Sequence, residues 1–211
     1  MSAPGQLHGA RAFALDAIAP MRWKNGGGTT REIAVWPPSA GMDDFDWRIS
    51  VADIAADGPF SAFPGVDRQI VLLEGTGVRL RARDASFDHR LDTVGAPFAF
   101  AGDVAVDATL LDGPTRDFNV MTRRGRCDAR IGRVSGAWRV PPQRGTVVLL
   151  SIAGDWHCDA LGSSFGARAG AIVPLGSGGV LTPVTGSATH PCCLAVMLAP
   201  AIDTDTHGTP S

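Results

Sequence analysis

The residue types best suited to chemistry gather near the N-terminus, in segment 21–33, MRWKNGGGTTREI. Three consecutive glycines allow positive φ angles and let another group approach the main chain closely. An ammonium group, a side-chain amide, hydroxyls and a guanidinium flank them, a set that could hold a small anion against main-chain N–H groups. The alternative is a flexible turn that starts a strand, because glycine-rich loops are common turn signals.

The glycine run is not a nucleotide-binding loop. A Walker loop places Lys-Ser or Lys-Thr directly after its last glycine and opens a helix. Here Lys24 precedes the glycines, and segment 29–35 is β-branched and strand-like. The Gly-x-Gly-x-x-Gly spacing of dinucleotide-binding folds is missing as well.

A second candidate is loop 57–68, DGPFSAFPGVDR, which ends at Arg68. Its prolines limit the entropy lost when the loop is ordered. Arg68 then enters an apolar strand, where a guanidinium can form a bidentate pair with a carboxylate. The partner is either a bound ligand or an internal carboxylate, for which the candidates are Asp67, Glu32 and Asp117.

A third candidate is segment 117–124, DFNVMTRR. Period-two alternation puts Asn119 and Met121 on one face and Phe118 and Val120 on the other, in the core. A methionine between polar neighbours is more typical of a pocket wall than of a polar edge strand.

Segment 47–53, WRISVAD, alternates in a similar way. One face carries Arg48 beside small residues, which leaves room for a ligand, although a solvent-facing strand surface explains the pattern equally well.

Catalytic machinery is hard to assemble from this chain. Ser61 lacks the strand-turn-helix nucleophile elbow. The candidates for acid–base chemistry are Glu32, Asp117 and Glu74, but no feature of the sequence pairs them. The polar residues are rich in donors to anions and poor in proton-transfer groups, which favours binding over catalysis.

The histidines, His8, His89, His157, His190 and His207, show no two residues spaced as metal ligands on one strand. We therefore predict no catalytic metal and no cofactor.

Composition narrows the class of protein. The 211 residues carry a formal net charge of −2, with no basic block typical of nucleic-acid binding. No apolar run is long enough to span a bilayer, and the first 20 residues lack the pattern of a signal peptide. We expect a soluble, cytoplasmic protein without nucleic-acid or membrane partners. Its cysteines form no CxxC pair and are expected to be buried thiols: Cys127, Cys158, Cys192 and Cys193.

Short strands with regular turn signals recur along the chain, which predicts a β-sandwich or barrel. The expected strands are Thr29–Trp36, Trp47–Ile54, Arg68–Glu74, Val78–Arg83, Phe98–Phe100, Asp103–Leu111, Phe118–Arg123, Thr146–Ile152, Ala171–Leu175 and Leu194–Leu198. A short helix is expected near Ala10–Ile18 or Asp53–Asp57.

Segment 69–77, QIVLLEGTG, is echoed by segment 146–154, TVVLLSIAG. Each is followed by a glycine-containing turn and further strands, which suggests a duplicated β-barrel module, with chance similarity of apolar strands as the alternative. The layout resembles the cupin jelly roll, although the His-x-His metal pair of many cupins is missing.

Taken in series, segments 23–33, 58–68 and 117–121 resemble the HutD/Ves family, over roughly residues 21–200. The resemblance implies a metal-free, two-module cupin-like fold. It also implies an accessory or regulatory role linked to bacterial histidine utilisation, or to stress response in the Ves branch. For the histidine-linked members it implies a pathway metabolite as ligand, such as urocanate or N-formylglutamate. Members of the family are not established enzymes.

We therefore predict an all-β protein, a cupin-like jelly roll with two β-barrel modules in one chain (bicupin-like). Residues 1–20 are an N-terminal extension that packs on the barrel, 21–135 the ligand-binding barrel, 136–200 a structural barrel, and 201–211 a flexible tail.

The predicted ligand is a small carboxylate, and a homodimer is compatible with the sequence. No residue is predicted to be catalytic, and the ligand-binding set is Trp23, Lys24, Asn25, Gly27, Thr30, Glu32, Arg48, Phe60, Ser61, Phe63, Arg68, Asn119 and Met121. One alternative is a metal-independent hydrolase or isomerase of a histidine-derived metabolite, with Glu32 or Asp117 as base. Another is a protein–protein adaptor.

Overall fold

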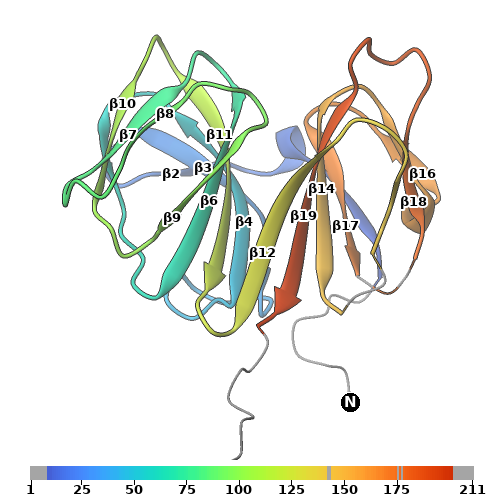
Figure 1. The fold of residues 1–211 in the computed structure, drawn as a ribbon, viewed down its shortest axis with the longest axis horizontal. Helices are drawn as coiled ribbons and strands as arrows, with labels where there is room; N and C mark the ends of the chain where they lie inside the picture. Colours follow the sequence, from blue (N-terminus) through green and yellow to red (C-terminus); the bar gives the residue numbers. More distant parts are fainter. Residues whose placement is uncertain (1–8, 142–143, 175, 177, 202–211) are drawn as a thin grey trace, which may run out of the picture.

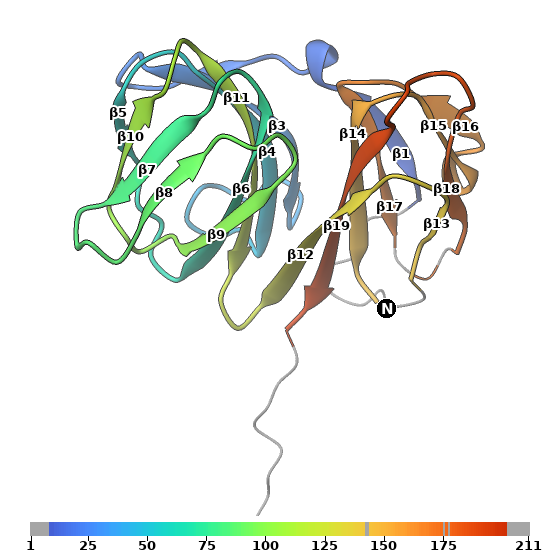
Figure 2. The same ribbon diagram turned by 45° about the horizontal axis from the view of Figure 1, so that its top comes forward.

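The structure is a computed structural model, which describes residues 9–141, 144–174, 176 and 178–201. Two β-barrels lie side by side, each built from a large and a small antiparallel sheet (Figures 1 and 2). The predicted all-β, two-barrel cupin-like class is confirmed. No helix in the described ranges is long and apolar enough to cross a membrane.

The N-terminal barrel combines a six-stranded sheet with a four-stranded one. The large sheet has the order β2 (Met21–Arg22), β3 (Gly28–Trp36), β4 (Trp47–Ile54), β11 (Thr115–Arg123), β6 (Val66–Glu74) and β9 (Pro97–Ala101). The small sheet has the order β5 (Gly58–Phe60), β10 (Val106–Leu110), β7 (Val78–Ala82) and β8 (Asp88–Leu91).

The C-terminal barrel combines a five-stranded sheet with a four-stranded one. The large sheet has the order β1 (Arg11–Ala14), β17 (Ala169–Pro174), β14 (Thr146–Ala153), β19 (Cys192–Pro200) and β12 (Cys127–Val134). The small sheet has the order β13 (Trp138–Arg139), β18 (Val180–Pro183), β15 (Trp156–Cys158) and β16 (Ser163–Phe165). Two single 3-10 turns, η1 (Leu15–Ala17) and η2 (Asp159–Leu161), complete the elements.

The two large sheets face each other and share one apolar core, to which β4 contributes Trp47, Ile49 and Val51 and β14 contributes Val148 and Leu150. Because strand side chains alternate between faces, the intervening residues of these strands point into the two barrel interiors. The strands are therefore buried on both faces, and each barrel interior is a compartment separate from the shared core.

Of the two places predicted for a short helix, the first holds a single 3-10 turn. Residues 10–18 form strand β1 and turn η1, and Phe13 and Leu15 pack against the shared core. Residues 53–57 are the end of β4 and a loop.

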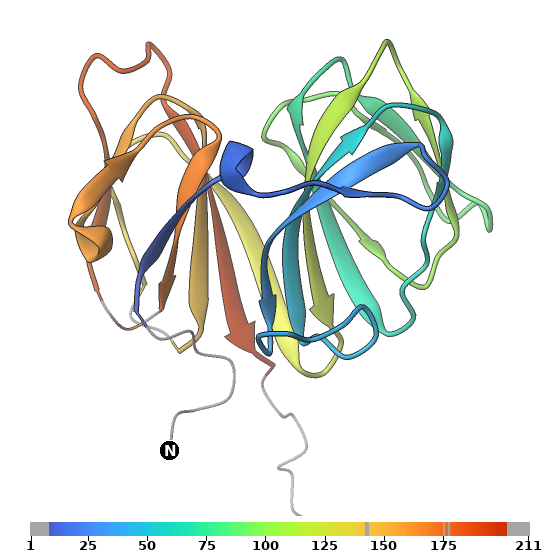
Figure 3. The same cartoon turned by 180° about the vertical axis from the view of Figure 1, so that it is seen from behind.

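The N-terminal segment crosses between the barrels. Strand β1 pairs with β17 of the C-terminal barrel, and the chain then runs across to β2 of the N-terminal barrel, as Figure 3 shows. Strand β12 pairs with β19, so residues 127–134 lie in the C-terminal sheet although we expected them in the first module. Side-chain burial explains this pairing, because Cys127, Ala129 and Ile131 face the shared core.

The sequence echo marks equivalent strands. β6 and β14 are both interior strands of a large sheet, and each leads through a glycine turn to a strand of the small sheet. The order β4-β11-β6-β9 matches the order β12-β19-β14-β17.

Candidate functional site

The interior of the N-terminal barrel carries the polar residues. Strand β11 lies between β4 and β6, and its Met121 is paired with Arg48 on one side and Arg68 on the other. Two residues along β11, Asn119 is paired with Ser50 in the same way. Arg48, Arg68 and Asn119 are 5%, 6% and 6% exposed, so the strand register brings three strongly polar groups together inside the barrel.

Arg68 is the centre of this group. Its Nη2 donates a hydrogen bond to Asn119 Oδ1 at 3.1 Å, and its Nη1 donates to the main-chain oxygen of Ser61 at 3.3 Å. Its Nε is buried and has no hydrogen-bond partner among the described residues. The guanidinium is therefore only partly satisfied, which is costly for a buried charged group.

No carboxylate of the described chain neutralises Arg68. Of the internal partners considered from the sequence, Glu32 accepts a hydrogen bond from Arg48 Nε at 2.7 Å and Asp67 pairs with Arg124. Asp117 is hydrogen-bonded to Thr115. Burial, together with the charge of Arg48, lowers the pKa of Arg68 to about 10.

Aromatic rings enclose the Arg68 guanidinium. Its Cζ lies 5.4 Å from the ring centroid of Phe60, 5.5 Å from that of Phe63 and 5.0 Å from that of Phe100. These cation–π contacts offset part of the cost of burying the charge. They leave the Nε edge as the unused part of the guanidinium, and an arginine edge is the group that binds a carboxylate side-on.

The glycine loop forms a turn and supports the site from a distance. Gly27 N donates to Asn25 Oδ1 at 3.0 Å, so this N–H is not available to an anion. A Cβ on Gly28 would lie 2.4 Å from the main-chain oxygen of Asp53, so close approach to β4 requires glycine there. Lys24 is exposed.

Trp23 connects the loop to the site. Its Nε1 donates to Thr30 Oγ1 at 2.7 Å, and its ring meets Phe60 edge to face at 6.4 Å between centroids. Trp23 and Thr30 therefore fix the position of Phe60, which in turn lies against the Arg68 guanidinium.

The structure thus separates the predicted residues by their distance from Arg68. Phe60, Phe63 and Asn119 contact its guanidinium, Met121 is paired with it across the sheet, and Arg48 with its partner Glu32 lies on the other side of Met121. Ser61 contributes its main-chain oxygen, while the residue itself is exposed. Trp23 and Thr30 support Phe60, and the remaining three, Lys24, Asn25 and Gly27, lie in the turn that precedes β3.

Phe100 was missed by the sequence analysis. It pairs with Arg68 across β6 and β9 and has the closest ring to the guanidinium. The alternation Phe98-Ala99-Phe100 was the available signal, since it places both rings on one face of a strand.

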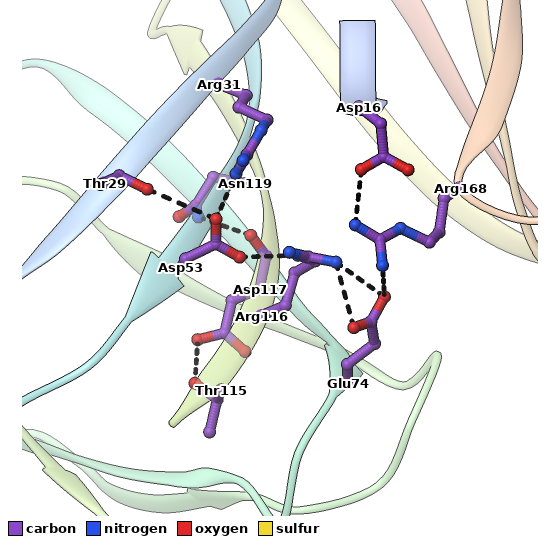
Figure 4. A network of polar contacts seen from close by, with 10 residues as sticks. All are labelled: Asp16, Thr29, Arg31, Asp53, Glu74, Thr115, Arg116, Asp117, Asn119 and Arg168. Atoms are coloured by element: carbon purple, nitrogen blue, oxygen red, sulfur yellow. Dashed lines mark hydrogen bonds and ion pairs between the residues drawn. The ribbon is translucent and has the colours of Figure 1, made fainter. Parts of the chain in front are cut away.

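A second polar network lies on the opposite face of the same sheet (Figure 4). Arg116 donates to Asp53 and Glu74, and Asp53 also pairs with Arg31. Burial raises the pKa of Asp53, but the hydrogen bonds and charges of Arg116 and Arg31 outweigh it and hold the pKa below its usual value. Arg168 of the C-terminal barrel links Glu74 to Asp16 (Figure 4), so this network joins the two barrels.

The cupin metal site does not fit this barrel. Among the described residues no three His, Cys, Asp or Glu side chains gather closely enough to hold a metal ion. The interior face of the large sheet carries the buried cations Arg48 and Arg68, and the strands of this sheet contain no histidine.

The cysteines behave as apolar residues. Cys127, Cys158 and Cys193 are buried, and Cys192 is half-buried. Burial raises the pKa of Cys127 to about 12, so its thiol stays protonated.

The fold and the site define a class: a two-barrel cupin-like protein with two buried arginines inside the N-terminal barrel. Solved cupin structures share this fold at low identity, among them a cupin 2 conserved barrel protein from Leptotrichia buccalis (11% identical, TM-score 0.58, 93% of this chain and 100% of that one). At this identity the likeness concerns the fold alone.

The chain belongs to the HutD family, whose model matches residues 16–179. HutD from Pseudomonas fluorescens SBW25 is 32% identical, with a TM-score of 0.77 over 91% of this chain and 99% of that one. A conserved protein of unknown function from Pseudomonas aeruginosa PAO1 is 33% identical, with a TM-score of 0.76 over 90% of this chain and 99% of that one. Protein Ves from Citrobacter koseri is 47% identical over 136 residues, which are 64% of this chain and 69% of that protein.

Proposed function

We propose that this protein binds a small carboxylate metabolite in the N-terminal barrel and acts as an accessory, regulatory protein. The observation that carries the proposal is Arg68, a buried guanidinium without a carboxylate partner in the described chain and with an unused Nε. A ligand carboxylate would supply the missing negative charge and accept the free N–H.

The charges around the guanidinium support an anion as ligand. Arg48 and Glu32 neutralise each other, so Arg68 leaves one unbalanced positive charge on this wall of the barrel. Asn119 holds the guanidinium by Nη2, which keeps it oriented before the ligand arrives. An oriented site loses less entropy on binding.

The ligand that we propose is a metabolite of histidine catabolism, urocanate or N-formylglutamate. The support is family membership together with the site chemistry, since both molecules carry a carboxylate and further hydrogen-bonding atoms. The HutD structure from Pseudomonas fluorescens was obtained in a formate condition, which makes formate a convenient minimal probe. The cytoplasm is the compartment in which such a role would be exercised.

A direct test incubates the purified protein with each metabolite and follows both turnover and binding. We expect saturable binding without turnover, accompanied by a gain in thermal stability, because a ligand that binds only the native state stabilises it by mass action. At about 100 times Kd the gain is roughly 2.7 kcal/mol. Turnover would instead support a metal-independent hydrolase or isomerase, and neither binding nor turnover would support an adaptor.

A further inference from the structure

Asp117 is a buried acid that the site described so far does not use. It lies on the inward face of β11, on the same face as Asn119, and is 0% exposed. Its Oδ2 accepts one hydrogen bond, from Thr115 Oγ1 at 3.1 Å. Its Oδ1 is buried and has no partner in the part of the chain that the structure describes.

The neighbours of Asp117 offer it no cation. Across the sheet it is paired with Ala52 on β4 and Leu72 on β6, whose side chains are apolar. Arg116 precedes it on β11, but alternation directs that guanidinium to the opposite face, where it pairs with Asp53 and Glu74 (Figure 4).

The other charged groups near Asp117 favour its neutral form or lie further along the barrel wall. Asp53 on β4 is a like charge. The pair Arg48–Glu32 and the unpaired Arg68 lie beyond Asn119 on the inward face. Burial, opposed by the Thr115 hydrogen bond and helped by the charge of Asp53, raises the pKa of Asp117 to about 7.

We propose that Asp117, in its protonated form, is the second anchor of the ligand site and donates a hydrogen bond to an acceptor at the far end of the ligand. This inference rests on the carboxylate-binding function proposed above. The proton sits on the buried Oδ1, which lacks a partner among the described residues, and Oδ2 keeps its hydrogen bond from Thr115.

The spacing of the two anchors defines the class of ligand. Arg68 Nη2 contacts Asn119, and Asp117 lies two residues further along the same face of β11, which is about 7 Å. The ligand therefore carries a carboxylate at one end and a hydrogen-bond acceptor, a carbonyl oxygen or an unprotonated ring nitrogen, at the other.

The net charge of the inward face indicates that the ligand is a monoanion. With Asp117 neutral, Arg48, Arg68 and Glu32 leave one positive charge on the inward face, which a single carboxylate balances. Urocanate fits this description with one carboxylate and an imidazole nitrogen, whereas N-formylglutamate brings two carboxylates. We therefore infer that the site prefers urocanate.

Binding should consequently depend on pH. Only the protonated acid donates, so for a ligand that does not itself titrate the affinity is constant below the pKa of Asp117 and falls about tenfold per pH unit above it. An ionised Asp117 would also place a negative charge in the site, which opposes an anionic ligand in the same direction.

The test is a calorimetric titration of urocanate into wild type and Asp117→Asn at about pH 6 and about pH 8. The amide keeps a donor but cannot ionise. For wild type we expect affinity roughly tenfold weaker at the higher pH; for the variant we expect binding at both pH values with the pH effect removed. The imidazole of urocanate titrates identically in both experiments, so the ratio of the two affinities isolates Asp117. Asp112→Asn, at an exposed aspartate before β11, is the matched control and should follow wild type.

A second measurement keeps the inference testable if Asp117→Asn does not fold. Titrations of wild type near pH 7 in two buffers of different ionisation enthalpy should show proton uptake on binding. Unchanged pH dependence in Asp117→Asn, or binding to wild type without proton uptake, overturns the role of Asp117 alone. If urocanate does not bind at either pH but N-formylglutamate does, the preference for a monoanion is wrong; if neither binds, the proposed function fails as well.

Discussion

The two barrels share one fold and both enclose an apolar cluster, but among the described residues only the N-terminal barrel also buries charged side chains. Aligning the repeated segments places Arg68 of β6 opposite Gly145, which directly precedes β14. The strand registers extend the comparison, because Asn119 pairs with Ile70 as Met197 pairs with Val147. The counterpart of Arg68 is therefore a glycine without a side chain, and the counterpart of Asn119 is the apolar Met197.

Asp117 follows the same rule. It pairs with Leu72, and in the C-terminal barrel the equivalent Leu149 pairs with Ala195. The C-terminal interior is filled by apolar side chains such as Trp156 and Leu181. A fold that packs well without buried charge in one copy does not need it in the other, so the charge of the N-terminal barrel points to binding rather than to stability.

Gly145, the counterpart of Arg68, lies at a position that has no room for a side chain. Gly145 has a φ of +131°, and a Cβ there would lie 2.0 Å from the main-chain oxygen of Leu198. Gly145→Ala should therefore lower the free energy of unfolding by at least about 3 kcal/mol, through a strained backbone and a main-chain clash. Urea unfolding measures this.

Gly132→Ala is the matched control for that variant. A Cβ on Gly132 would meet no atom within 4 Å beyond its chain neighbours, so stability should change by no more than about 0.5 kcal/mol. Equal effects of the two substitutions would mean that the position equivalent to Arg68 is not closed to side chains.

Replacing Arg68 by an apolar residue tests whether the N-terminal barrel is stable without this buried charge. Arg68→Met removes a buried charge that has no carboxylate partner among the described residues, so the ligand-free protein should keep its stability or gain about 1–4 kcal/mol, while carboxylate binding is lost. Arg116→Met is the contrasting variant, because it removes one of the two arginine partners of Asp53 and of Glu74 and should destabilise the protein. A large loss of stability in Arg68→Met would make Arg68 a structural residue.

A polar substitution at Met197, the counterpart of Asn119 in the C-terminal barrel, should have a smaller effect on stability. Met197→Asn places an amide in the apolar interior of the C-terminal barrel and should lower stability by about 1–3 kcal/mol. Ligand affinity of the folded fraction should stay at the wild-type value, as determined by calorimetry. Weakened binding in this variant would show that the second barrel takes part in the site.

A further prediction concerns the pH dependence of stability that Asp117 causes. Its pKa is raised to about 7 in the folded protein, so the folded state holds a proton that the unfolded state loses near pH 4. This contribution to stability is present below the unfolded pKa and is lost as pH rises through about 7. Urea unfolding across this window should show a downward slope for wild type that is missing in Asp117→Asn, and an identical slope in both proteins would rule out Asp117 as its source.

Most long strands of the large sheets could be predicted from the sequence because their patterns alternate clearly, but β12 was not among the predicted strands although it has eight residues. Trp47–Ile54 was predicted to the residue. Short strands such as β13 and β15 escaped prediction, because two or three residues carry no period.

The isolation of Arg68 could not be predicted. Whether a carboxylate neutralises Arg68 depends on which arginine each carboxylate pairs with. Strand register and loop packing determine these pairs. Glu32 goes to Arg48 through the pairing of β3 with β4, and Asp67 goes to Arg124 at the end of β11. Residue types alone left these pairings open.

The most direct test of the account is the affinity of one small carboxylate for wild type and for Arg68→Lys, measured by calorimetry near pH 6.5, below the pKa of Asp117. The substitution keeps the charge but replaces the arginine fork by a point charge. The account predicts one saturable site per chain in wild type and binding roughly tenfold to a hundredfold weaker in Arg68→Lys, which corresponds to about 1.5–3 kcal/mol. Equal affinities in the two proteins, together with a large loss of stability in the variant, would contradict it.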